Sequence, residues 1–181
     1  RQQHDLVCAA AADSSAASLL AAAEHITGIQ RIEVPAGDSL LDGGEAVLDS
    51  TARVIYYNGD LDPRLAAFFI AHEYAHEWQQ HARYARCTID DVDPQAGEVR
   101  VPLGIQRIEG YGPEERRERE ANVFAREFLL PTHLLRQLFI EEGLDASVIA
   151  DRLGLLEGMV LHQLSVALLT PELSINDPEL V

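Results

Sequence analysis

The chain has 181 residues, of which 47% are apolar and 24% are charged, and this length and composition are typical of one globular domain with a buried core. Acidic residues outnumber basic ones by 30 to 14, which gives a formal net charge of -16. Because this charge repels phosphate groups, direct binding of nucleic acid is disfavoured. The sequence has no apolar run of the roughly 18 to 20 residues that a membrane-spanning helix needs, so no membrane span is expected.

The chain has two cysteines, Cys8 and Cys87, and no CxxC pair. Two cysteines are too few for a disulfide framework, and the absence of a CxxC pair argues against a zinc knuckle. We therefore expect reduced thiols and a cytoplasmic protein. The sequence begins at Arg1 without a methionine, and we expect it to be part of a longer chain.

Residues 1–50 are predicted to form an N-terminal unit of uncertain affiliation. An alanine-rich amphipathic helix is expected to run to about His25, built on Leu6, Val7, Leu19 and Leu20. Alternating β-branched residues predict a strand over 26–35. Residues 36–50 are rich in turn-forming residues, and a bend is predicted at Gly43 and Gly44.

Residues 51–137 are predicted to form the core. A strand is expected over 52–58, and Asp62 as N-cap followed by Pro63 predicts the start of a long helix that extends to Arg86. An irregular loop is expected over 88–113. A second helix is expected to begin at Pro113 and to stop before Pro131, with an apolar face made of Val123, Phe124, Phe128 and Leu129.

Residues 138–170 are predicted to form a C-terminal helical segment. The sequence IADRLGLLEGMVLHQL within it has the apolar spacing and central glycine of a helix-turn-helix. At the net charge of this chain, these helices are expected to be structural or protein-binding rather than DNA-reading. Together the elements predict an α+β fold that is mostly helical, with a small sheet beside the helix over 64–86.

The pentapeptide from His72 to His76 is an HExxH motif inside a predicted helix. Residues four apart share a helix face, so the imidazoles of His72 and His76 can converge on one metal ion. Glu73 lies next to that face, where a carboxylate can accept a proton from a water molecule at the metal. The motif therefore predicts a metal site with Glu73 as general base.

A zinc site needs a third protein ligand. The metzincin spacing is excluded, because Gln79 and Ala82 stand where that class has a glycine and a third histidine. The later helix has Glu118 and Asn122 one turn apart on the same face, so the carboxylate can bind metal while the amide orients a ligand. Glu120 is the alternative ligand, but it points roughly 200° around the helix from Glu118. Zinc suits two imidazoles and a carboxylate, with manganese as the alternative.

The sequences HEYAHEW, from His72, and EREANVFAREFLLP, ending at Pro131, resemble the ImmA/IrrE family of metallopeptidases. That family is characterised by HExxH and a later segment close to ExxANxFAxxLLxP. The resemblance extends roughly from Val54 to Leu169. The chain keeps the following residues of the later segment: Glu118, Ala121, Asn122, Phe124, Ala125, Leu129, Leu130 and Pro131.

The resemblance implies that His72, His76 and Glu118 are metal ligands and that Glu73 is the general base. The known members are cytoplasmic and cleave helix-turn-helix repressors. The resemblance therefore implies a metal-dependent endopeptidase whose substrate is a protein regulator such as a transcriptional repressor. The alternative is a non-catalytic, metal-containing module that binds a partner or regulates a larger protein, and the presence of Glu73 favours catalysis over it.

Two further features bear on substrate binding. The strand over 52–58 either pairs with an extended substrate or is an ordinary strand of the sheet, and the sequence does not decide between them.

Trp78 is expected to pack its helix against the core. Candidates for stabilising an oxyanion rest on residue type alone, and they are Tyr56, Tyr57, His81, Tyr111 and His133.

Overall fold

The computed structural model describes residues 2–79 and 113–169. Nearly all of the loop predicted over 88–113 lies outside these residues, as do Cys87, His81 and Tyr111. In chain order the described elements are α1 (Gln2–Ala10), α2 (Ala16–Thr27), β1 (Gln30–Val34), a 3-10 turn (Ser39–Leu41), β2 (Ala46–Asp49), β3 (Val54–Asn58), α3 (Pro63–Trp78), α5 (Pro113–Leu129), α6 (Thr132–Arg136), a π-helical turn (Gln137–Glu141), α7 (Ala146–Leu153) and α8 (Glu157–Leu169).

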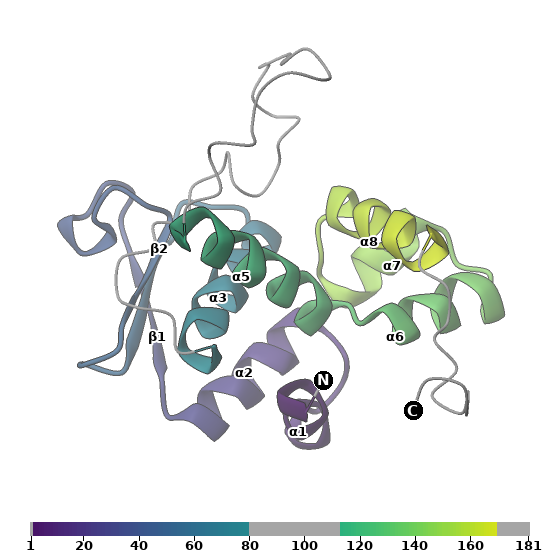
Figure 1. Ribbon diagram of the computed structural model, residues 1–181, viewed down its shortest axis with the longest axis horizontal. Helices are drawn as coiled ribbons and strands as arrows, with labels where there is room; N and C mark the ends of the chain where they lie inside the picture. Colours follow the sequence, from purple (N-terminus) through teal and green to yellow (C-terminus); the bar gives the residue numbers. More distant parts are fainter. Residues whose placement is uncertain (1, 80–112, 170–181) are drawn as a thin grey trace, which may run out of the picture.

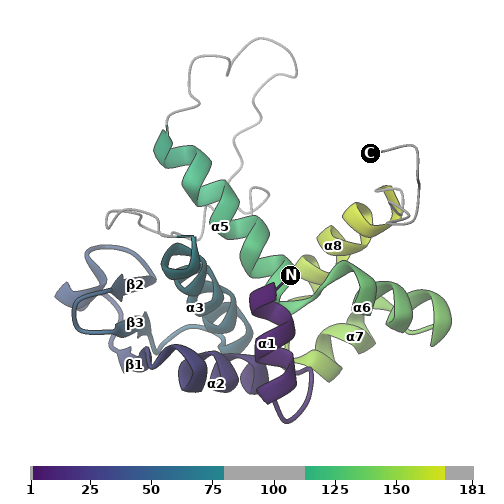
Figure 2. The same cartoon turned by 60° about the horizontal axis from the view of Figure 1, so that its bottom comes forward.

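The fold is α+β and mostly helical, which confirms the predicted class. A small sheet lies on one side of α3, and α5 packs along the other side (Figures 1 and 2). The C-terminal helices α6, α7 and α8 lie beyond the C-terminal end of α5 (Figure 1). One hydrophobic cluster includes Leu19, Ile55, Phe128 and Val160, so residues from all three predicted ranges of the chain share a core.

The single N-terminal helix predicted to run to His25 is wrong, because two helices are separated by a turn. The Asp13 carboxylate accepts a hydrogen bond from the Ser15 N–H at 2.8 Å, and the Ser15 hydroxyl accepts one from the Ser18 N–H at 3.3 Å. Short polar side chains that bind nearby main-chain groups in this way end one helix and cap the next. Val7 is buried as expected, whereas Leu6 is 60% exposed.

The first strand is shorter than predicted, because α2 occupies the first two residues of the range 26–35. The helix ends at Thr27, and Gly28 follows with a φ of 66°. This left-handed conformation favours glycine and closes the helix. The strand β1 therefore begins only at Gln30.

The sheet contains a strand that the sequence did not reveal. Residues 36–50 were expected to form turns alone, but Ala46–Asp49 form β2. The strand order among the described residues is β1-β3-β2, with β1 parallel and β2 antiparallel to β3. Because β3 has a partner on both sides, it is an ordinary sheet strand and has no free edge for a substrate. Within the part that the structure describes, β2 lies at the edge next to α3.

The helix α3 begins as predicted, since Pro63 is its first residue and the Asp62 carboxylate accepts a hydrogen bond from the Arg64 N–H at 2.8 Å. The helix ends at Trp78, and Gln79 follows with φ -90° and ψ 0°. The remainder of the range predicted for this helix, 80–86, lies outside the described residues. Every residue from Ala66 to His76 is buried. The helix is therefore the centre of the fold, with the sheet on one side and α5 on the other.

The helix α5 ends at Leu129, and Pro131 follows as predicted. Its buried face differs from the prediction, because Val123 is 59% exposed. Small alanines allow α5 to lie close to α3, and the buried face has an i, i+4, i+7, i+8 pattern made of Ala121, Ala125, Phe128 and Leu129. Trp78 packs against the core as expected, with its ring centroid 5.4 Å from those of Tyr74, Phe124 and Phe128.

The helices α7 and α8 are bent by 119° relative to each other. Gly154, with a φ of 67°, opens the short turn between them, so this segment has helix-turn-helix geometry. Buried Ile149, Leu153 and Leu164 join the main core. Among the described helices, no single one is long and apolar enough to cross a membrane, and only the bent pair of α7 and α8 meets the length and composition criteria together.

Candidate metal centre

The helices α3 and α5 bring three metal-binding side chains to one place. His72 Nε2 lies 2.9 Å from His76 Nε2 and 3.1 Å from Glu118 Oε2, and His76 Nε2 lies 3.6 Å from Glu118 Oε1. Ligands bound about 2.0 to 2.1 Å from a tetrahedral zinc ion are separated by about 3.3 Å. The spacing of these three side chains therefore fits a zinc ion.

Asn122 determines which nitrogen of His72 faces this cluster. The Asn122 Oδ1 atom lies 3.0 Å from His72 Nδ1. Because an amide oxygen only accepts hydrogen bonds, Nδ1 carries the hydrogen and donates it, which leaves a lone pair on Nε2. This is the tautomer that binds a metal, and a partner at the other ring nitrogen is the usual way of fixing it.

Within this cluster, hydrogen-bond acceptor atoms face one another with no donor between them. The lone pair of His72 Nε2 is directed towards a carboxylate oxygen, and Glu118 Oε1 is buried without a hydrogen-bond partner among the described residues. Uncompensated buried acceptors of this kind are unfavourable. A cation between the three side chains removes the conflict, so the donor set itself fits a metal ion.

Glu73 is held beside the cluster by the edge strand of the sheet. Its Oε2 atom accepts a hydrogen bond from the Leu48 N–H at 2.9 Å, whereas its Oε1 atom is buried without a partner in the described part of the chain. One Glu73 oxygen also lies within 4.8 Å of donor atoms of His72 and His76. Burial raises the pKa of Glu73 well above its usual value, with a smaller rise from the charge of Glu118 and a decrease from the Leu48 N–H. The Glu73 side chain thus lies next to the cluster of candidate metal ligands.

The two candidate third ligands are separated by the structure. Glu118 is in the cluster, with 16% of its side chain exposed. Glu120 lies on the outer side of α5, where its carboxylate binds Arg116 at 2.8 Å. The geometry therefore favours Glu118 and leaves Glu120 outside the site.

The contact from Leu48 is the part of the site that sequence reasoning missed. It is made by a main-chain N–H, so no side-chain type at position 48 signals it. A strand of four residues in a turn-rich segment also gives little periodicity. Only the pairing of β2 with β3, in which Leu48 lies opposite Ile55, brings this group to Glu73.

The described candidates for an oxyanion stabiliser lie elsewhere. The hydroxyl of Tyr57 is 3.5 Å from Glu33 Oε2 on β1, and burial, followed by the charge of Glu33, raises the pKa of Tyr57. Tyr56 is half-buried on the central strand, and His133 is exposed on α6. No contact between the described residues brings Tyr56 or Tyr57 to the metal cluster.

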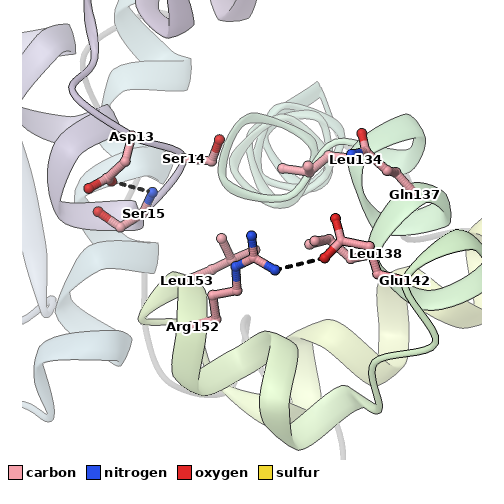
Figure 3. Close-up of a pocket in the computed structure, with 9 residues that line it drawn as sticks. All are labelled: Asp13, Ser14, Ser15, Leu134, Gln137, Leu138, Glu142, Arg152 and Leu153. Carbon is pink, nitrogen blue, oxygen red and sulfur yellow. Dashed lines mark hydrogen bonds and ion pairs between the residues drawn. The ribbon is translucent and has the colours of Figure 1, made fainter.

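A separate cavity of about 390 Å³ lies between the α1–α2 turn, the π-helical turn and α7 (Figure 3). Its walls include Ser14, Gln137 and Arg152. Arg152 is paired with Glu142 at 2.8 Å, as the dashed line in Figure 3 shows. No predicted site residue lines this cavity, so it is not part of the metal centre.

The comparison with protein families bears on the later of the two motifs. The family model described as Peptidase_M78: IrrE N-terminal-like domain matches residues 106–165. This range contains Glu118 and Asn122 and most of the C-terminal helices, and it begins after the HExxH motif. A search of curated proteins gives no significant match. The resemblance to the ImmA/IrrE metallopeptidases is thus confirmed over residues 106–165, which are similar to the IrrE N-terminal-like domain of that peptidase family.

Proposed function

We propose that the protein is a metal-dependent endopeptidase that cleaves a protein regulator. The observation that carries the proposal is the convergence of His72, His76 and Glu118 at 2.9 to 3.6 Å, with Asn122 holding His72 in the metal-binding tautomer. The match to a peptidase family supports a hydrolase acting on peptide bonds. His72, His76 and Glu118 are proposed as the ligands of zinc, with manganese as the alternative.

A metal ion held by these residues would supply a Lewis acid for the scissile carbonyl and would lower the pKa of a bound water towards about 7. The contribution of the chain itself centres on Glu73. Its Oε1 atom is buried and has no hydrogen-bond partner among the described residues, so it is available to the attacking water. Glu73 accepts a proton from that water as general base and then donates it to the leaving amine as general acid.

The edge strand β2 offers a binding place for an extended substrate. The Glu45 carbonyl accepts a hydrogen bond from the Asn58 N–H of β3, whereas the Leu48 N–H points to Glu73. In an antiparallel ladder, main-chain groups of alternate residues face opposite sides. The main-chain groups of Ala46 and the Leu48 carbonyl therefore face away from β3, where a substrate strand can add to the sheet. The strand over 52–58, for which substrate pairing was one of two alternatives, contains β3, the central strand of the sheet.

The proposed substrate is a cytoplasmic transcriptional repressor of the helix-turn-helix type. Its support is the family resemblance together with the net charge of -16, because an acidic surface attracts a basic DNA-binding protein and repels DNA. Binding of DNA by the chain itself is not proposed.

The test measures metal content and peptide hydrolysis on the same preparation. Protein purified without chelator is expected to contain about one zinc or manganese ion per chain by mass spectrometry. It is expected to cleave peptides from a proteome-derived mixture, while Glu73→Gln retains the metal and loses hydrolysis. Bound metal without any hydrolysis would favour the non-catalytic binding module. Folded protein that takes up neither metal would refute the proposed metal centre.

A further inference from the structure

Arg126 lies on α5 in the same row of side chains as Glu118 and Asn122. These three residues are spaced by four, so they follow one another along one side of the helix. Arg126 is about 6 Å beyond Asn122 along the helix axis, at 1.5 Å per residue. Side chains on a helix lean towards its N-terminus, so the long side chain of Arg126 extends towards the turn that carries Asn122.

Arg126 is half-buried, and no carboxylate among the described residues is paired with it. Burial alone lowers the pKa of its guanidinium group. Five other arginines of the described chain have carboxylate partners, in the pairs Arg31–Glu24, Arg53–Glu77, Arg64–Asp151, Arg116–Glu120 and Arg152–Glu142. Partial burial of an uncompensated charge is unfavourable. In a chain with a charge of -16, such an arginine indicates a negatively charged ligand from outside.

The charge of Arg126 acts on a histidine of the neighbouring helix α8. Burial, and after it the positive charge of Arg126, lower the pKa of His162 on α8. The two helices are joined by the amide of Gln163, which donates to Glu127 Oε2 at 3.0 Å and to the Leu130 carbonyl at 3.1 Å. Glu127 and Gln163 are the chain neighbours of Arg126 and His162, so their hydrogen bond brings the guanidinium group and the imidazole to the same seam between α5 and α8. Both groups bind carboxylates well.

We propose that Arg126, assisted by His162, forms a subsite that binds the carboxylate of an acidic side chain of the substrate near the bond cleaved at the metal centre. This inference rests on the proposed peptidase function and adds a substrate preference for Asp or Glu. Arg126 acts as a specificity-determining residue.

The binding test uses NMR on the full chain as purified. The probe is N-acetyl-glutamate α-amide, which carries one side-chain carboxylate, and N-acetyl-glutamine amide is the neutral control. The acidic probe is expected to shift the His162 ring signals in a saturable way, whereas the neutral probe has no effect. In Arg126→Gln the affinity is expected to fall roughly tenfold to hundredfold, which is the usual effect of losing a charge-assisted hydrogen bond.

The matched control is Arg116→Gln, which changes the same residue type on the outer side of α5 and is expected to bind the acidic probe like the wild type. The urea midpoint of Arg126→Gln is expected to be equal to or above that of the wild type, because an unpaired half-buried charge is removed. No saturable shift, or an equal shift in Arg126→Gln, would overturn the subsite. Binding of N-acetylglycine in place of the acidic probe would mean that the site takes a chain terminus, which also overturns the proposal as stated.

The cleavage test compares the sites cut in a proteome-derived peptide mixture by the wild type and by Arg126→Glu. The wild type is expected to cut near Asp or Glu, and the charge-reversed variant is expected to shift to Lys or Arg. An unchanged profile would refute the assigned specificity. If the wild type cleaves nothing, the proposed function fails, and the NMR titration still decides whether Arg126 binds a carboxylate.

Discussion

Asn122 accepts a hydrogen bond from His72 across the interface between α5 and α3, with 3.0 Å between Asn122 Oδ1 and His72 Nδ1. Removing this acceptor frees the imidazole to rotate and to change tautomer. We expect Asn122→Ala to weaken zinc binding by roughly 10- to 100-fold, the usual effect of losing such a partner. Competition with a chelator of known affinity measures the change.

The matched variant is Asn122→Asp, which keeps an oxygen acceptor at the same position. It is expected to bind zinc within a few-fold of the wild type or more tightly. If Asn122→Ala binds zinc as tightly as the wild type, the hydrogen bond does not prepare the ligand, and the role assigned to Asn122 is wrong.

Glu118 and Glu120 are two residues apart, but the structure places only Glu118 near the histidines. We expect Glu118→Ala to lose more zinc affinity than Asn122→Ala, because a proposed ligand is removed rather than its support. Glu120→Ala is expected to retain the metal, since Glu120 binds Arg116 on the exposed side of α5. Metal analysis after gel filtration compares the two variants, and loss of metal from Glu120→Ala alone would reverse the assignment.

The sequence was sufficient for the parts of the site that depend on local periodicity. The spacing of His72 and His76 requires only a helix, and the N-cap signal of Asp62 locates its start. The position of Glu118 relative to Glu120 also follows from helix geometry alone.

The parts that the sequence did not reveal depend on contacts between distant residues. The strand β2 is four residues long and exists because it pairs with β3. Leu48 reaches Glu73 through its main chain, which leaves no trace in residue type. The helix α5 buries Ala121 and Ala125 because these small side chains allow α3 to approach closely. The larger Val123 lies on another side of α5 and is exposed.

Glu73 is expected to act in hydrolysis and not in metal binding. Glu73→Gln retains a carbonyl oxygen that can accept from the Leu48 N–H, so the fold and the zinc content are expected to remain. The rate of peptide hydrolysis is expected to fall by about 10²- to 10⁴-fold, the usual contribution of a general base. Metal analysis and hydrolysis measured on one preparation test this, and a variant that loses its zinc would show that Glu73 is needed to build the site.

Ile149 on α7 is fully buried, although it lies in the C-terminal segment away from the metal centre. Because Ile149 belongs to the main hydrophobic core, Ile149→Ala is expected to lower the free energy of unfolding by about 2 to 5 kcal/mol, and Ile149→Val by about 0.5 to 1.5 kcal/mol. Urea denaturation measures both variants. A negligible effect of Ile149→Ala would mean that α7 and α8 fold independently of the site.

Asp145 caps α7, and its ionised form is favoured in the folded protein. Its carboxylate accepts hydrogen bonds from the Val148 N–H at 2.9 Å and from the Ser147 hydroxyl at 2.8 Å. The first of these contacts, followed by the second, lowers the pKa of Asp145 below its ordinary value of 3.8. Its contribution to stability is therefore present above pH 3.8 and is lost as the pH falls through the lower value of the folded state.

The variant Asp145→Asn keeps a good N-cap but has no titrating group. In chelator-treated protein, the urea midpoint of the wild type relative to Asp145→Asn is expected to decrease between pH 7 and pH 3. Asp145→Ala removes the cap and is expected to be less stable than the wild type at pH 7. Only a carboxylate that is more acidic in the folded state gives the expected pH dependence. If the difference in urea midpoint between the wild type and Asp145→Asn stays constant over this pH range, the charge of Asp145 does not stabilise the helix.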